Sequence, residues 1–154
     1  MAPLLPQDLI KLLDLKPHPE GGFFRETYRS KEKTGGHNLS TAIYFLLPKG
    51  AVSKLHRLKS DELWHFHLGD PLTLVQIFSD RMEKETLGSK VTAGEKLQHV
   101  VPAGCWFGAY PTGAYSLVGC TVSPGFDFAD FEMGDRKKLL NDFPQATEEI
   151  RKLT

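Results

Sequence analysis

The sequence has no net charge and no concentration of charge of one sign. Its 19 lysines and arginines balance 19 aspartates and glutamates, which are mixed along the chain. Nucleic acids and anionic membranes attract proteins with basic patches, so neither is expected as a partner. The sequence also lacks an apolar run of about 18 residues and the pattern of a secretory signal. These absences predict a cytoplasmic protein.

Cysteine is scarce as well. The two cysteines, Cys105 and Cys120, lie among apolar and small residues, and nothing else suggests the oxidising surroundings in which a disulfide forms. We therefore expect reduced thiols. Cys120 has no histidine or cation beside it in the sequence, which favours a small buried side chain over a nucleophile.

Short runs rich in β-branched and aromatic residues fill the chain from Phe23 to about Ser123. Glycine and proline clusters separate these runs at intervals of roughly 8–12 residues, which is typical of a β-sandwich or barrel. The expected strands are Phe23–Arg29, Thr41–Leu47, Glu62–His67, Thr73–Phe78, Gln98–Val101, Cys105–Ala109 and Tyr115–Val122.

Helical spacing of leucine and isoleucine appears only near the two ends. Residues 9–13 form a short amphipathic pattern, which Pro17 and Pro19 end. Apolar residues recur at helical spacing again beyond Asp135. With 154 residues, no repeat and no long linker, the chain is expected to form a single domain, residues 1–154, that is all-β with short N- and C-terminal helices.

Two blocks bounded by glycine resemble the two motifs of the cupin superfamily. The first spans residues 50–69 and contains His56 and Glu62 at the motif spacing, and the second spans residues 94–107. The resemblance implies a double-stranded β-helix, the jelly-roll barrel of cupins. It also implies pairing of two such barrels, so a homodimer is expected.

In metal-binding cupins the two motifs supply three histidines and one glutamate. By resemblance these fall here on His56, Leu58, Glu62 and Phe107. Only two of the four side chains can bind an ion, whereas a tightly held divalent metal needs at least three good donors. We therefore predict no metal and no cofactor.

His65 and His67 do not restore a metal site. Alternate side chains of a strand share a face, so these two lie opposite the face of Glu62, Trp64 and Phe66 unless the strand bulges. A polar pair on the outer side of the sheet is the favoured interpretation. The remaining histidines have no ligand spacing and are interpreted as ordinary: His18, His37 and His99.

Five runs of sequence resemble one cupin family in particular, catalogued as domain of unknown function 985. The resemblance covers nearly the whole chain, and the family label names no reaction. The runs are HPEGGFFRETYRS (18–30), STAIYFLL (40–47), SDELWHFHLGDPL (60–72), VVPAG (100–104) and SLVGCTVSPGFDFADFE (116–132).

A more distant similarity is to dTDP-4-dehydrorhamnose 3,5-epimerase, a metal-free cupin. Its GFF triplet followed by a glutamate is similar to residues 22–24 and Glu26. The resemblance implies that Phe24 and Glu26 contact a nucleobase and that His56 is a general base. The acid tyrosine of that enzyme falls near Val118, and Tyr110 and Tyr115, which lie nearby in the sequence, are candidate replacements.

His56 and Glu62 are the candidate catalytic pair, a base and its orienting carboxylate, because burial in an apolar barrel shifts both pKa values. The alternative is a buried polar pair that satisfies itself. The candidate ligand-binding residues are Phe24, Glu26, Lys54, Trp64, Phe66 and Phe107. Lys54 supplies positive charge if it shares a strand face with His56, while the aromatic residues are pocket walls or, alternatively, plain core.

Three functions follow from these residues. The favoured one is a metal-independent cupin that binds a nucleoside diphosphate or nucleotide sugar in its barrel and isomerises or epimerises the sugar. The alternatives are a metal-dependent dioxygenase or lyase with a reduced ligand set, and a non-catalytic module that binds a metabolite. The metal-dependent alternative rests only on His56, Glu62 and analogy of fold, and the sequence does not separate the favoured function from the non-catalytic module.

Overall fold

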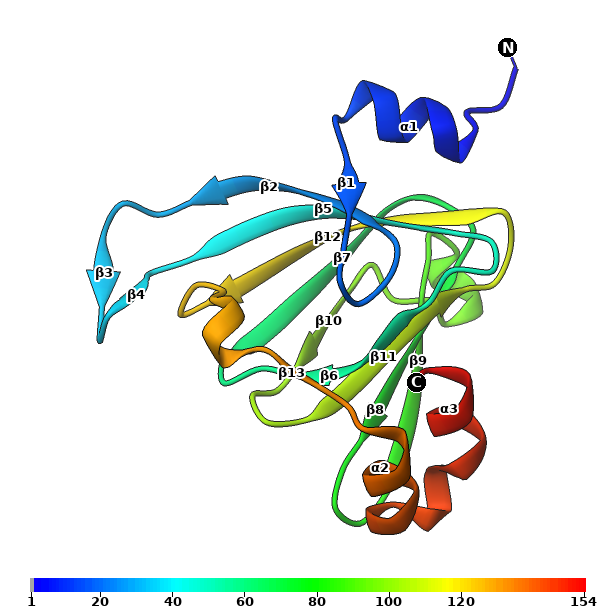
Figure 1. The fold of residues 1–154 in the computed structure, drawn as a ribbon. Coiled ribbons are helices and arrows are strands. Elements are labelled where there is room, and N and C mark those ends of the chain that lie inside the picture. The colour runs from blue at the N-terminus through cyan, green and yellow to red at the C-terminus, as the bar shows by residue number, and fades with distance from the viewer. Residues whose placement is uncertain (1) are drawn as a thin grey trace.

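Two antiparallel sheets face each other in the computed structural model, which describes residues 2–154 (Figure 1). The first sheet has the order β1-β2-β5-β12-β7-β10, with bounds Lys16–Pro17, Phe23–Arg29, Thr41–Pro48, Tyr115–Ser123, Asp61–Gly69 and Gln98–Val101. The second has the order β13-β6-β11-β8-β9, with bounds Glu132–Met133, Ser53–Arg57, Trp106–Pro111, Leu72–Ile77 and Met82–Leu87. A small hairpin, β3 (Lys33–Thr34) and β4 (His37–Asn38), projects from the β2–β5 end. This arrangement confirms the predicted all-β jelly roll.

All seven predicted strands are present, with ends that differ by a few residues. Two longer strands, β6 and β9, were not predicted. The β9 sequence MEKETL is mostly charged and polar, which suits its place at the edge of the second sheet, where a strand needs protection from pairing with another chain. The β6 sequence SKLHR likewise lacks the β-branched and aromatic residues that identify a strand.

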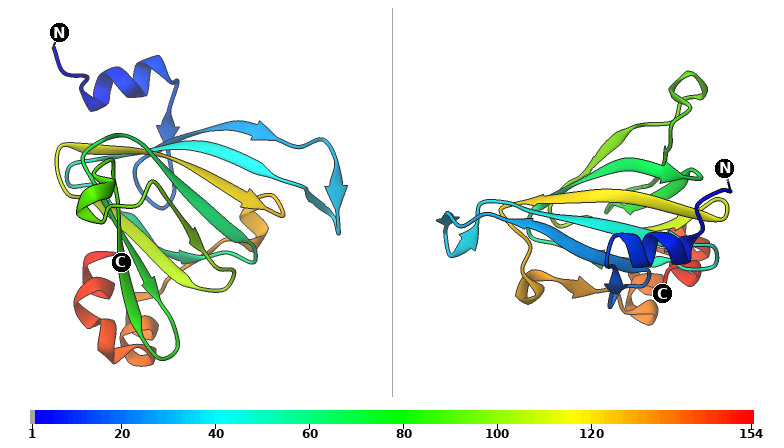
Figure 2. Two further views of the ribbon diagram at one scale, coloured as in Figure 1. Left: turned by 180° about the vertical axis from the view of Figure 1, so that it is seen from behind. Right: turned by 90° about the horizontal axis from the view of Figure 1, so that it is seen from above.

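Short helices at both ends of the chain cover the outside of the sheets, as predicted (Figure 2). The first helix, α1 (Pro6–Leu12), packs Leu9 against Leu46 and Leu117 of the first sheet. Near the other end, α2 (Arg136–Asp142) and α3 (Thr147–Lys152) cover the second sheet. Three 3-10 turns complete the fold: η1 (Val91–Ala93), η2 (Phe128–Asp130) and η3 (Pro144–Ala146).

Aromatic and aliphatic side chains fill the space between the two sheets. Both sheets contribute, and this interior cluster includes Phe45, Leu47, Trp64, Leu72, Leu74, Phe107 and Val118. Cys105 and Cys120 are both free and buried. Burial raises the pKa of Cys105 to about 11 and that of Cys120 well above its usual value, so neither thiol is a nucleophile at neutral pH.

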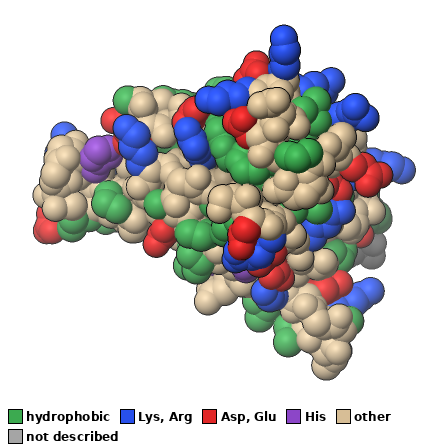
Figure 3. Space-filling model, turned by 90° about the horizontal axis from the view of Figure 1, so that it is seen from below, with side chains coloured by type: hydrophobic (Ala, Val, Ile, Leu, Met, Phe, Trp, Pro, Cys, Tyr) green, Lys and Arg blue, Asp and Glu red, His purple; other side chains and the backbone are tan. Residues whose placement is uncertain are grey.

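The surface matches the balanced composition. Side chains of both charges are interspersed over the face seen in Figure 3, from which the β3–β4 hairpin projects. Among residues 2–154, no helix has the length and apolar character needed to cross a membrane.

Candidate functional site

A cavity of about 300 Å³ lies inside the barrel, with walls from both sheets. Apolar side chains make up most of its wall, among them Phe24, Ile43, Leu58 and Val122. Six acidic, basic or histidine side chains also line it: His18, Glu20, Glu26, Arg29, His56 and Glu62. The sequence interpretation included three of these six residues, Glu26, His56 and Glu62.

Glu20 reaches the cavity because the chain turns sharply between β1 and β2. The turn ends in Gly21 and Gly22, both with positive φ (113° and 70°), a conformation that glycine adopts without strain. A hydrogen bond from the Lys54 amide to the Glu20 carbonyl, 2.8 Å long, ties the turn to β6. At Gly21 a β-carbon would collide with the carbonyl oxygen of Val52, so no larger residue fits.

Replacing Gly21 by alanine is expected to lower the free energy of unfolding by about 2–3 kcal/mol, because strained φ and a backbone clash act together. Urea unfolding measures this loss. Gly36→Ala is the matched control, since Gly36 also has a positive φ of 85° but a β-carbon added there would meet no atom within 4 Å. Equal losses for the two variants would contradict the tight approach at Gly21.

His56 is held at both ring nitrogens. Its Nδ1 lies 2.6 Å from the Lys54 carbonyl oxygen, and its Nε2 lies 3.0 Å from Oε2 of Glu20. A carbonyl only accepts, so Nδ1 carries a hydrogen. With Glu20 ionised, Nε2 carries one too, and His56 is an imidazolium. Ser53 donates to the other Glu20 oxygen at 3.0 Å.

The pKa shifts of Glu20 and His56 agree with this buried ion pair. Burial by itself would raise the pKa of Glu20, but the positive charge and hydrogen bond of His56 outweigh burial, so the Glu20 pKa lies below its ordinary value. Burial by itself would lower the pKa of His56, but Glu20 and then Glu62 raise it above its ordinary value. The predicted pairing of His56 with Glu62 is therefore wrong: the carboxylate that orients His56 is Glu20.

Glu62 lines the same cavity. Its side chain is buried, and Oε2 has no hydrogen-bond partner. Burial raises the Glu62 pKa to about 7, against the opposing effect of the His56 charge. A carboxyl group with this pKa gives up and takes back a proton near neutral pH.

His18 completes the polar side of the cavity. Its Nδ1 accepts a hydrogen bond from the Glu20 amide at 3.1 Å, so the hydrogen of the neutral ring is on Nε2. Burial lowers the pKa of His18, and the ring packs edge-on against Phe24, with centroids 4.5 Å apart. The interpretation of His18 as an ordinary histidine does not match its position in the cavity wall.

Phe24 and Glu26 both line the cavity. Glu26 is paired with Arg29, with 2.6 Å between Oε1 and Nη2. The Arg29 guanidinium also donates to the Asn38 side chain and to the Phe126 carbonyl. Arg29 is thus fully engaged by protein groups.

Lys54 lies outside the cavity, contrary to the prediction from strand alternation. In the pairing of β6 with β11, His56 lies opposite Phe107 and Ser53 opposite Ala109, so β6 has one extra residue between them. This bulge lets Ser53 and His56 both face inward and turns Lys54 to solvent.

Three predicted aromatic residues belong to the interior cluster rather than to the cavity wall. Trp64 and Phe107 are fully buried, and the Phe107 ring packs on the His56 ring at 4.1 Å between centroids. Phe66 packs against the same interior cluster. The alternative interpretation of these three residues, as plain core, therefore fits the structure.

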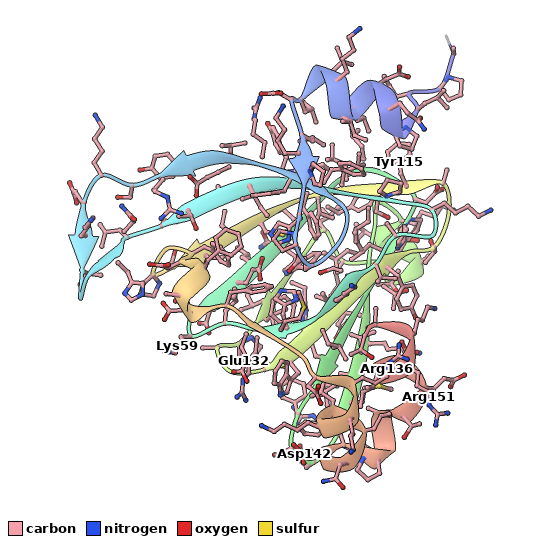
Figure 4. The ribbon with its side chains drawn as sticks, in the orientation of Figure 1. Lys59, Tyr115, Glu132, Arg136, Asp142 and Arg151 are labelled. Atoms are coloured by element: carbon pink, nitrogen blue, oxygen red, sulfur yellow. The ribbon has the colours of Figure 1, made fainter. Side chains whose placement is uncertain are left out.

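Tyr115 is far from this chemistry. Figure 4 shows it at the end of the molecule near α1, whereas Lys59 lies at the opposite end. It begins β12 and packs with Leu9, Leu15 and Leu46 under the helix. The proposed replacement of the epimerase acid by Tyr115 is wrong. Tyr115 is the first residue of β12 and does not line the cavity, whereas Cys120 and Val122, near the other end of the same strand, do.

The outward positions of His65 and His67 are as predicted. Glu62 and Trp64 are buried, whereas His67 is exposed and His65 donates to or accepts from the Thr121 hydroxyl at 3.1 Å. Residues 2–154 contain no group of three or more histidine, cysteine, aspartate or glutamate side chains arranged to hold a metal. Leu58 lines the cavity and both nitrogens of His56 are engaged, so the donor set does not fit the metal that the cupin fold implies.

The connection 124–131 covers the cavity with Phe126 and Phe128. The His37–Asp130 ion pair, 2.5 Å between Nε2 and Oδ2, ties it to the β3–β4 hairpin. Lys59 adds a 3.4 Å contact to Asp130. His37 was also interpreted as ordinary, and this contact between distant segments was not visible in the sequence.

Because of this ion pair, we expect the stability of the connection 124–131 to depend on pH. The hydrogen bond to Asp130 raises the pKa of His37 above 6.5, and the hydrogen bond from His37 lowers the pKa of Asp130. The stabilising contribution of His37 to this connection is complete below pH 6.5 and is lost as pH rises through its folded pKa.

Hydrogen exchange measures this effect. The protection factors of amides 125–131 should fall as pH rises through the His37 pKa, and they should be low at every pH in Asp130→Asn. Lys59→Ala is the control, with a smaller effect. A pH-independent protection factor would contradict the role of His37.

The chain is similar to proteins of several organisms. The family described as "Cupin superfamily (DUF985)" matches residues 7–134. The "Uncharacterized protein YML079W" of Saccharomyces cerevisiae is 32% identical over 146 residues, which cover 80% of this chain and 72% of that protein.

Solved structures show the same fold. Protein SO0799 from Shewanella oneidensis has a TM-score of 0.94 at 43% identity, covering 99% of this chain and 98% of the other. A protein from Leishmania major has a TM-score of 0.93 at 37% identity, with coverage of 98% and 99%. Oxalate decarboxylase from Bacillus subtilis has a TM-score of 0.61 at 17% identity, covering 90% of this chain and 36% of that one. At that identity the likeness concerns the fold alone.

Proposed function

This chain belongs to the DUF985 family of the cupin superfamily, and we propose that it is a metal-independent cupin that binds a small organic molecule and exchanges a proton with it through Glu62. One observation supports this most: Glu62 is buried in the cavity wall with an unpartnered oxygen. A pKa of about 7 suits both directions of proton transfer.

His56 and Glu20 have a supporting role in this proposal. The imidazolium has no lone pair to accept a proton while it donates to the Lys54 carbonyl and to Glu20. Its positive charge faces Glu62 and favours the carboxylate form. Glu62 removes a proton from a hydroxyl-bearing carbon beside a carbonyl group of the ligand, and the same carboxyl returns a proton on the same face to the carbon that had been the carbonyl, while the hydroxyl proton moves to the neighbouring oxygen; the result is an isomerisation.

The ligand class that we propose is a nucleoside diphosphate or nucleotide sugar. A cavity of about 300 Å³ is at the small end of ligand pockets, so the sugar occupies it and the nucleoside extends past Phe24 and Glu26. Arg29 is already engaged by Glu26. We therefore expect the sugar, rather than the diphosphate, to supply most of the affinity.

The test has two arms. Calorimetry with a panel of nucleotides and nucleotide sugars should show binding that Phe24→Ala weakens and that His67→Ala, on the outer sheet face, leaves unchanged. NMR in D2O should show deuterium incorporation into a bound sugar, and Glu62→Gln should abolish it. Binding without incorporation would favour a non-catalytic module, and incorporation that requires an added metal would contradict the metal-independent mechanism.

A further inference from the structure

His18 has a hydrogen-bond donor in the cavity wall that no protein group uses. Its Nδ1 accepts from the Glu20 amide at 3.1 Å, so the hydrogen of the neutral ring is on Nε2. The hydrogen bonds of residues 2–154 include none at Nε2, and this atom is not one of the fully enclosed, unpartnered atoms, which belong to Glu62, Trp64 and Glu149. The side chain keeps 6% of its surface accessible. A ligand in the cavity can therefore reach this N–H.

Four aromatic rings surround His18. Phe24 packs edge-on at 4.5 Å between centroids, and Phe45 lies at 5.6 Å. Phe128 and Phe131, from the connection that covers the cavity, lie at 6.3 and 6.4 Å. Burial lowers the pKa of His18, so the ring is neutral at neutral pH. A neutral ring held in one tautomer by a backbone hydrogen bond is a donor that needs little reordering when a ligand binds.

The charges of the wall favour a neutral acceptor for this N–H. His56 is paired with Glu20, and Arg29 is paired with Glu26. Glu62 adds negative charge as pH rises through its pKa of about 7. Every cation among the described residues of the wall is thus already paired, which disfavours an anionic ligand group. A carbonyl oxygen carries no charge and needs only the N–H.

We propose that Nε2–H of His18 donates a hydrogen bond to the carbonyl oxygen of the ligand. This role rests on the proposed function and adds a second catalytic residue to it. When Glu62 takes the proton from the neighbouring carbon, the C–H electron pair forms a carbon–carbon double bond and the carbonyl π pair moves onto the oxygen. The hydrogen bond from His18 stabilises this negative oxygen, while the His18 proton stays on Nε2. The oxygen remains negative until the hydroxyl proton of the ligand moves to it, and the carboxyl then returns its proton to the former carbonyl carbon.

Cyclohexanone labelled with 13C at the carbonyl carbon is the probe, because the NMR shift of that carbon reports hydrogen bonding to the oxygen. In an apolar cavity without a donor, the signal would move from its position in water toward its position in a hydrocarbon solvent. With His18 as donor, we expect the signal of the bound probe to stay at the aqueous position or to move beyond it. A shift toward the hydrocarbon position in the unmodified protein would overturn the proposal, as would no binding at millimolar concentration.

Two substitutions separate the donor from a structural role of His18. His18→Asn keeps an oxygen for the Glu20 amide but has no N–H at the position of Nε2. His18→Gln carries an amide N–H to that position but leaves the Glu20 amide without its acceptor. We expect His18→Asn to weaken cyclohexanone binding about tenfold, the effect of one lost hydrogen bond, and His18→Gln to retain most of it. The reverse order would show that His18 only positions Glu20, and it would overturn the proposal.

Methylenecyclohexane is the control probe, since it has a similar shape without the oxygen. His18→Asn should change its affinity little, and equal weakening of both probes would contradict a hydrogen bond to the carbonyl. His67→Asn, on the outer sheet face, should alter the binding of neither probe. Deuterium incorporation into a bound nucleotide sugar that His18→Asn leaves unchanged would remove only the role of His18. A hydrogen-bonded carbonyl without any deuterium incorporation would remove only the proton transfer.

Discussion

Replacing Glu20 by alanine is expected to lower the free energy of unfolding by about 3–5 kcal/mol near pH 6, the usual cost of removing one partner of a buried ion pair. His56 is 2% exposed and would keep its hydrogen bond to the Lys54 carbonyl but lose its counter-charge. Ser53 would lose its acceptor as well. Urea unfolding of the two proteins, followed by circular dichroism, measures the difference.

The pH dependence identifies the cause of this loss. The Glu20 pKa is lowered from 4.5, so its contribution is present above pH 4.5 and is lost as pH falls through the folded pKa. The His56 pKa is raised from 6.5, so its contribution is complete below pH 6.5 and is lost as pH rises through the folded pKa. The difference between the proteins should therefore be largest between pH 4.5 and 6.5.

Glu26→Ala is the matched control for this experiment. Glu26 also forms an ion pair, with Arg29, but the two side chains are 40% and 39% exposed. Exposed pairs contribute about 0–1 kcal/mol, so the loss should stay within that range. A loss for Glu20→Ala no larger than for Glu26→Ala would show that His56 does not depend on Glu20.

The fold was largely predictable because its strands follow local rules. A strand with buried aromatic and β-branched residues, such as β5 or β12, identifies itself by composition. The strands that were missed, β6 and β9, depend on their neighbours. Their sequences favour no strand by themselves, and pairing with β11 and β8 gives them their conformation.

The site was less predictable because it depends on contacts between distant segments. Spacing along one strand correctly placed Glu62 and Trp64 on the inner face and His65 on the outer face. Glu20 comes from another part of the chain, and the only local signal was a glutamate before two glycines that force a turn. Lys54 was misplaced because the bulge in β6 is set by its pairing with β11.

Replacing Glu62 by glutamine is expected to raise the free energy of unfolding by up to about 3 kcal/mol at pH 8 and to leave it nearly unchanged at pH 4.5. Burial raises the folded pKa of Glu62 from 4.5 to about 7. The unfolded chain therefore loses its proton first, and the stability of the unmodified protein falls as pH rises from 4.5 to 7. Above pH 7 the full penalty of a buried carboxylate is present. Glutamine has no charge to bury, so it avoids this penalty.

Thermal or urea unfolding across this pH range distinguishes the titration of Glu62 from a general packing effect. Asp61→Asn is the control, since Asp61 precedes Glu62 on β7 but is exposed, and its removal should produce no such pH-dependent gain. A pH-independent effect of Glu62→Gln would contradict a pKa near 7. Glu62→Gln can be compared in both experiments. If the variant gains stability at high pH and also loses deuterium incorporation into the bound sugar, the carboxyl that destabilises the fold is the group that the proton transfer requires. This is expected when a site retains a residue at the expense of stability.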